Sequence, residues 1–155
     1  MQVSEQITDP FWWQGKEFTF LGASDVDELF LPESYGLEPK APHTGCWKGF
    51  VVQFSVRDGQ LFLDTLWVND KNKRYPRING KKARFCWREQ GFHVYPKLNL
   101  KLDYTGSVLV GRERSEDAKD RAFVGAAFYA DVWELTFLRG KLIKYMRELI
   151  SHDYF

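Results

Sequence analysis

The sequence predicts a mostly-β fold, an antiparallel up-and-down meander that closes into a barrel or a strongly bent sheet, with at most one or two short helices. Apolar and polar residues alternate with period two in several segments, and two-residue turns that contain glycine separate these segments. Aromatic residues make up 17% of the 155 residues, and flat rings pack well on pleated strands. Because a long aromatic meander tends to close and so remove its edges, we expect a sheet of roughly 8 strands.

The clearest hairpin is predicted on either side of Asp58-Gly59. Residues 46–57 alternate as a half-buried strand, and Asp and Gly both tolerate the positive φ of a type I′ turn. In the returning strand, residues 60–68, both faces are largely apolar, so this strand is expected to be buried on both sides. One of those faces carries Leu61, Leu63, Thr65 and Trp67.

Further hairpins are predicted in the second half of the chain. Residues 98–104 alternate and return through Thr105-Gly106 into a strand over residues 107–112. The charged residues 113–121 are interpreted as a loop or one short surface helix. The last hairpin joins residues 132–138 through Arg139-Gly140 to a segment that begins as a strand and ends in a helical turn.

Residues 1–155 are expected to form a single domain. Its acidic lead-in, residues 1–45, holds eight acidic and two basic side chains, and its residues 25–42 contain three prolines, typical of a wrapped loop. A basic hairpin insert, residues 70–88, holds eight basic residues and only Asp70. The net charge of +1 therefore conceals two oppositely charged segments, which either lie against each other or leave the basic one for a partner.

The basic insert supplies the candidate binding residues, and Ile78-Asn79-Gly80-Lys81 predicts a second hairpin within it, with residues 85–87 on the far arm. Cations interleaved with rings such as Tyr75 and Phe85 are also what single-stranded nucleic-acid binders use. A pI of about 7.7 is far from a strongly basic domain, so another protein is the expected partner rather than nucleic acid. The candidate partner-binding residues are Arg74, Tyr75, Arg77, Lys81 and Lys82.

The sequence presents no clear catalytic or metal-binding constellation. His43 stands three residues before Cys46, which leaves a Cys–His nucleophile as one alternative, although Cys46 is more simply a small core residue. An acidic pair from Asp25, Asp27, Glu28 and Glu33 is the other route to a hydrolase. The three histidines are far apart and Cys-x-x-Cys is absent, so neither a metal site nor a cofactor is expected.

The sequence shows neither a secretory signal peptide nor a transmembrane segment. No basic start followed by an apolar run opens the chain, and no stretch approaches 18 consecutive apolar residues. Two cysteines are too few for a disulfide scaffold, and the sequence leaves open whether Cys46 and Cys86 are bonded to each other. We therefore expect a cytoplasmic protein with no membrane contact, and nothing in the pattern indicates an oligomeric state.

Two stretches carry a family resemblance. Residues 44–50, with Cys46-Trp47-Lys48-Gly49-Phe50, and the closing residues 132–142 resemble a recurrent pattern in small uncharacterised bacterial β-rich proteins, a domain of unknown function. The resemblance covers about half of the chain, departs most at residues 70–88, and rests on strand and turn motifs. It implies a small intracellular bacterial protein and brings no catalytic residue with it.

These observations favour a non-enzymatic protein that acts by binding another protein, of the toxin-neutralising or regulatory type. Two alternatives remain open. A barrel lined by rings could bind a small apolar ligand if its interior were hollow. A hydrolase could use Cys46 with His43 or the acidic pair.

Overall fold

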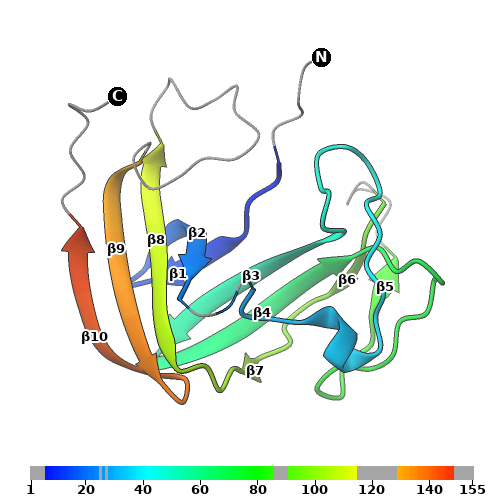
Figure 1. The fold of residues 1–155 in the computed structure, drawn as a ribbon. Coiled ribbons are helices and arrows are strands. Elements are labelled where there is room, and N and C mark those ends of the chain that lie inside the picture. The colour runs from blue at the N-terminus through cyan, green and yellow to red at the C-terminus, as the bar shows by residue number, and fades with distance from the viewer. Residues whose placement is uncertain (1–5, 25, 27, 86–90, 115–128, 149–155) are drawn as a thin grey trace.

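The computed structural model describes residues 6–24, 26, 28–85, 91–114 and 129–148 (Figure 1). In this part of the chain the one helix is a 3-10 turn, η1 (Pro32–Tyr35), and no helix is long and apolar enough to cross a membrane. The strands are β1 (Pro10–Trp13), β2 (Lys16–Ala23), β3 (Phe50–Arg57), β4 (Gln60–Val68), β5 (Arg84–Phe85), β6 (His93–Tyr95), β7 (Leu100–Lys101), β8 (Gly106–Arg114), β9 (Tyr129–Leu138) and β10 (Lys141–Glu148).

Seven of these strands form a closed barrel, in the order β10-β9-β8-β2-β1-β3-β4. The pair Lys141–Gln60 joins β10 back to β4 and closes it. The predicted mostly-β barrel is therefore confirmed. Its strand order differs from a simple up-and-down meander, because the first hairpin inserts between β3 and β8 and makes β1 parallel to β3.

That first hairpin, β1 with β2, lies inside the segment interpreted only as an acidic lead-in. Gln14 and Gly15 form its two-residue turn, with φ of 54° and 72°. Alternate side chains, Phe11, Trp13 and Phe18, are at most 3% exposed and face the core. The period-two pattern and the glycine turn that identify the other hairpins are therefore present here too.

The hairpin β3–β4 is confirmed, with Asp58 and Gly59 at φ of 50° and 73°. Its first strand is shorter than the predicted residues 46–57, because residues 46–49 form a turn with Gly49 at φ of 82° and β3 begins at Phe50.

The predicted faces of β4 need a correction. Asp64 is an extra residue, because Thr65 lies opposite Gln53 while Leu63 lies opposite Phe54. After this β-bulge, the side chains of the strand point to the opposite faces from those that simple alternation predicts. The side chains that are 0% exposed are therefore Leu61, Leu63, Leu66 and Val68. Phe62, Thr65 and Trp67 are only half-buried, so the strand is not buried on both sides as predicted.

The predicted strand over residues 98–104 is wrong except for its short centre, β7. Lys97 and Asn99 have φ of 52° and 47°, a left-handed conformation that interrupts an extended strand. β7 pairs with β4 and not with β8, so Thr105-Gly106 does not close a hairpin there. β8 itself agrees with the predicted strand over residues 107–112.

The last hairpin is confirmed, with Arg139 and Gly140 at φ of 49° and 82°. The final segment continues as strand β10 to Glu148, as expected for its first part. The helical turn predicted after it lies outside the described residues, as do residues 115–121 of the predicted loop or helix.

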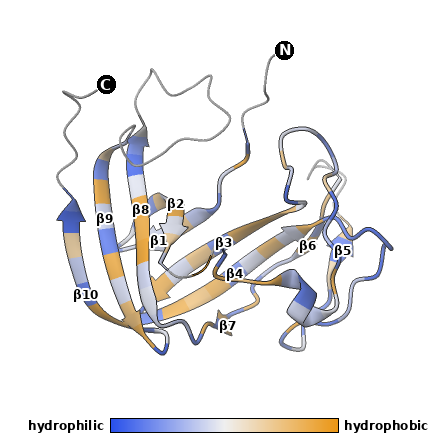
Figure 2. Ribbon diagram, in the orientation of Figure 1, coloured by the Kyte–Doolittle hydropathy of each residue, from blue (hydrophilic) through white to orange (hydrophobic). Residues whose placement is uncertain are grey.

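Side chains fill the space that the barrel encloses. Phe11 and Phe54 are 0% exposed, with ring centroids 6.0 Å apart, and Phe20 packs 5.5 Å from Phe54. Figure 2 shows the apolar residues running along β3, β4, β8 and β9. A side chain with no accessible surface borders no void that could hold a water molecule. The centre of the barrel is therefore a packed core, and a ligand there would have to displace these rings.

Gly59 and Gly140 offer a direct test of the barrel closure. An alanine Cβ at position 140 would lie 2.1 Å from the Leu102 carbonyl oxygen, whereas one at position 59 would have nothing within 4 Å. Both glycines have positive φ, so G59A should lower the free energy of unfolding by about 1 kcal/mol. G140A should lower it by roughly 3 kcal/mol, because strain and overpacking add. Urea denaturation of both variants measures this, and equal losses would contradict the tight closure at Gly140.

Candidate partner-binding surface

The candidate binding residues lie on the chain between β4 and β6, at the end of the molecule opposite β8, β9 and β10 (Figure 1). We call residues 71–84 the basic loop. It carries seven cations and no acidic residue, and all seven are exposed. Within the described ranges none of them lies within ion-pair distance of a carboxylate. They are Lys71, Lys73, Arg74, Arg77, Lys81, Lys82 and Arg84.

The buried carboxylate of Asp70 fixes the start of the basic loop. Asp70 is 1% exposed. Its Oδ1 accepts the backbone N–H of Glu38 at 2.6 Å, and its Oδ2 accepts the N–H groups of Asn72 and Arg74 at 2.9 and 3.0 Å. One side chain thus connects the two loop residues that follow it, Asn72 and Arg74, to the wrapped loop around Glu38.

The ionisation of Asp70 follows from these contacts. Burial alone would raise the pKa of this carboxyl. The N–H groups of Arg74, Glu38 and Asn72, with the charge of Lys73, outweigh that effect and lower the pKa below its ordinary value. Asp70 is therefore a carboxylate at neutral pH, bonded to the backbone rather than paired with an exposed cation.

Tyr75 is part of the scaffold that supports the loop. It is half-buried, and its hydroxyl accepts the backbone N–H of Asp70 at 3.1 Å. Its ring stacks on His93 with centroids 3.8 Å apart, and the exposed ring of Phe85 makes an edge contact with His93 at 5.5 Å between centroids. Burial raises the pKa of Tyr75, and burial together with Lys73 lowers the pKa of His93. The imidazole is thus neutral at pH 7.

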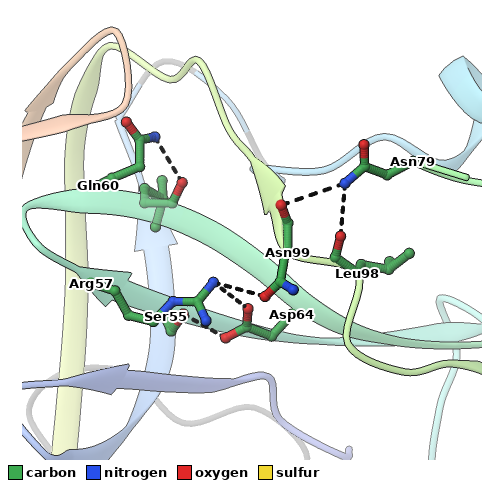
Figure 3. Close-up of polar contacts among 8 residues, drawn as sticks. Ser55, Arg57, Gln60, Asp64, Asn79, Leu98 and Asn99 are labelled. Carbon is green, nitrogen blue, oxygen red and sulfur yellow. Dashed lines mark hydrogen bonds and ion pairs between the residues drawn. The ribbon is translucent and has the colours of Figure 1, made fainter. Parts of the chain in front are cut away.

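Three further contacts hold the middle of the loop. The hydroxyl of Tyr95 donates to the carbonyl of Pro76 at 2.5 Å, and burial raises the pKa of Tyr95 to about 12. Ile78 is 1% exposed and belongs to the main core. Asn79 donates to the carbonyls of Leu98 and Asn99 at 2.8 and 3.5 Å (Figure 3).

The hairpin predicted at Ile78–Lys81 is present only as its turn, with Asn79 and Gly80 at φ of 48° and 75° and one bridge between Ile78 and Lys81. Its expected far arm, strand β5, pairs with β6 instead. The cations on either side of the turn, Arg77, Lys81 and Lys82, therefore project from a backbone of defined shape. Arg77 also donates to the Gly80 carbonyl at 3.3 Å.

The polar cluster in Figure 3 links this turn to the β3–β4 hairpin. Asp64, the bulged residue of β4, accepts from Ser55 Oγ at 2.5 Å and from Arg57 Nη2 at 3.0 Å. The same Arg57 nitrogen donates to Asn99 Oδ1 at 3.1 Å. The bulge thus positions residues 98 and 99, whose carbonyls bind Asn79.

The acidic lead-in contacts the start of the basic insert through the backbone. Pro39 forms a bridge with Asp70, and the N–H of Lys71 donates to the Glu38 carbonyl at 2.7 Å. Two lead-in carboxylates, those of Asp9 and Glu28, pair instead with Lys48 at 2.5 and 3.6 Å. The two segments therefore lie together, yet the cations of the loop still face solvent.

The residues of the hydrolase alternative are arranged differently from a catalytic pair. Cys46 is a free thiol, 2% exposed, in an apolar cluster with Val51 and Phe92. Burial raises the pKa of its thiol, which is the opposite of what a nucleophile needs. His43 Nδ1 accepts the N–H of Gly45 at 3.1 Å. Of the acidic candidates, Glu33 is exposed on η1, and Asp25 and Asp27 lie outside the described residues.

Two residues that support this surface, Asp70 and His93, are not among the candidates predicted from the sequence. Asp70 stands out in the sequence as the one acid in a basic run, which is the available signal for a structural carboxylate. His93 gives no local signal, because its stacking partner Tyr75 is 18 positions away in the chain.

Comparison of the chain with protein-family models, with curated proteins and with solved structures finds no match. The resemblance to small bacterial β-rich proteins therefore stays a prediction, and the function has to be argued from the surface itself.

Asp70 is the residue whose substitution tests the scaffold. D70N should lower the free energy of unfolding by about 2 kcal/mol, because an amide cannot accept three N–H groups as a carboxylate does. The folded-state pKa of Asp70 is lowered, so its contribution is complete above the ordinary carboxyl pKa and is lost as the pH falls through the folded value. The difference between the wild type and D70N should thus narrow below about pH 4.

Chemical denaturation from pH 3 to pH 7 measures this difference. The matched control is D58N, at an exposed turn position with φ of 50° that Asn also accepts, where a change within about 0.5 kcal/mol is expected. A loss in D70N that is the same at every pH would show that the charge of Asp70 does not matter.

Proposed function

We propose that this chain is a non-enzymatic binding protein whose basic loop binds an acidic surface of another protein, in a regulatory or toxin-neutralising role. The observation that carries the proposal is the set of seven exposed cations that lack a carboxylate partner in the described ranges. A cytoplasmic location and a bacterial origin are part of the same proposal.

Charge alone is common on protein surfaces, so the shape of the loop is the second support. Asp70, Tyr95 and Asn79 fix the backbone at three points along the loop. Binding by a preformed loop costs less conformational entropy than binding by a loop that must first become ordered. Cations held on such a scaffold can steer an acidic partner and then match its charges in one orientation.

The rings near the loop suit a protein partner. Phe85 is 66% exposed beside the stacked pair Tyr75 and His93. A large exposed ring on a basic surface can enter a pocket on the partner and provide most of the binding energy, while the cations set the association rate.

Charge reversal on the loop tests this function. In R74E/R77E the backbone N–H of Arg74 still reaches Asp70, so the fold should persist while the surface charge changes sign. Proteins that copurify with the wild-type chain from cells that encode it should be lost with R74E/R77E and with K81E/K82E. For an isolated partner at low salt, the association rate should fall by about tenfold or more.

The control is K141E/K144E, which makes the same change in net charge on exposed lysines of β10, at the other end of the molecule. It should retain the partner and its association rate. If the loop variants and the β10 variant bind the same proteins equally well, the basic loop is not the binding surface.

A further inference from the structure

A recess of about 340 Å³ lies beside the basic loop, between residues 40–42 and 69–73. Three lysines, Lys40, Lys71 and Lys73, line it together with the buried Asn69 and Asp70. Pro42 and Gly91 form part of its wall. None of the three lysines is among the predicted binding residues. Lys71 and Lys73 belong to the basic insert, and only the fold brings Lys40 next to them.

Backbone contacts hold the two lysine-bearing segments side by side. The N–H of Lys40 donates to the Asn69 carbonyl at 2.8 Å, and Asn69 Nδ2 donates back to the Lys40 carbonyl at 2.7 Å. The N–H of Lys71 donates to the Glu38 carbonyl at 2.7 Å. The lysines therefore stand on a braced pair of chains rather than on independent loops.

Close packing at two glycines fixes the floor and the wall of the recess. A Cβ at Gly49 would lie 2.6 Å from the backbone nitrogen of Lys40, so the Lys40 backbone rests directly on that glycine. A Cβ at Gly91 would lie 2.9 Å from Pro42 Cβ. Both glycines also have positive φ, 82° and 90°, so their geometry depends on the absence of a side chain.

The charge inside the recess is not balanced by its own residues. Both oxygens of Asp70 accept backbone N–H groups, which fixes this carboxylate to the chain. Lys73 Nζ donates to Asn69 Oδ1, and Lys40 and Lys71 have no ion-pair partner among the described residues. Three lysines and one fixed carboxylate line the recess, and this excess of positive charge is what a bound anion would neutralise.

We propose that this recess binds an oxyanion, a carboxylate or a phosphate, and that it is the anchor point for an acidic group of the partner. This inference rests on the proposed function and adds the site where the first charge is captured. Lysine ammonium groups bind carboxylate and phosphate as point charges. A recess partly excludes water, and an ion pair in less water is stronger than the same pair on the open loop.

The free anions can be tested directly on the whole chain. Inorganic phosphate and sodium acetate, titrated separately, should produce saturable shifts in the amide NMR signals of Lys40 and residues 69–73. Which anion saturates at the lower concentration distinguishes a phosphate site from a carboxylate site. Shifts that stay linear up to about 50 mM of both anions would overturn the inference.

A matched pair of variants separates the recess from general charge. K71Q/K73Q removes two charges from the recess and should weaken anion binding by about tenfold. K81Q/K82Q removes two charges from the same loop outside it and should weaken binding by no more than about twofold. Equal weakening by both would show that the anion responds to overall charge and that the recess is not a site.

Copurification of the partner with these variants shows whether the recess proposal or the proposed function has failed. If K71Q/K73Q keeps the partner that R74E/R77E loses, the loop binds the partner and the recess proposal fails alone. If the anions saturate in the recess and no protein depends on Arg74 and Arg77, the proposed function fails while the anion site stands.

Discussion

The hydrogen bonds to the buried carboxylate of Asp70 are the interaction on which the binding surface depends. Three backbone N–H groups from two distant parts of the chain meet on this side chain. A carboxylate removed from water needs such donors, and here they are the backbone of the segments that carry the lysines. Because both oxygens of Asp70 accept backbone N–H groups, this carboxylate forms no ion pair with the exposed cations of the loop. The positive charge of the loop is therefore left facing solvent.

The barrel provides a rigid base for this surface. Its interior is filled by rings and aliphatic side chains, so β3 and β4 extend from a packed core towards the basic loop. The bulge at Asp64 belongs to the same support, because it orders residues 98 and 99, which hold Asn79. Polar side chains at irregular positions, such as Asp64 at the bulge and Asn79 in the turn, thus connect the barrel to the basic loop.

The sequence predicts those elements that depend only on neighbouring residues, such as a glycine turn or an alternation of apolar and polar side chains. The glycine turns at Asp58-Gly59 and Arg139-Gly140 and the strand β10 are of this kind. The parallel pairing of β1 with β3 joins residues more than 40 positions apart and leaves no local pattern. The reversal at Asp64 was hidden because both faces of β4 are apolar, and the positive φ of Lys97 and Asn99 occurs without glycine. The cations of the loop were visible in the sequence, whereas Tyr95, Leu98 and Lys40, which shape the surface, come from elsewhere in the chain.

Amide hydrogen exchange in the free protein tests the central claim most directly, because that claim is a loop ordered before any partner binds. The N–H groups of Glu38, Asn72 and Arg74 donate to Asp70. They should exchange slowly, with protection comparable to that of β3 and β4, and their backbone order parameters should be near 0.85, a value typical of rigid backbone. Rapid exchange with order parameters below about 0.6 would show a flexible loop and would contradict the account.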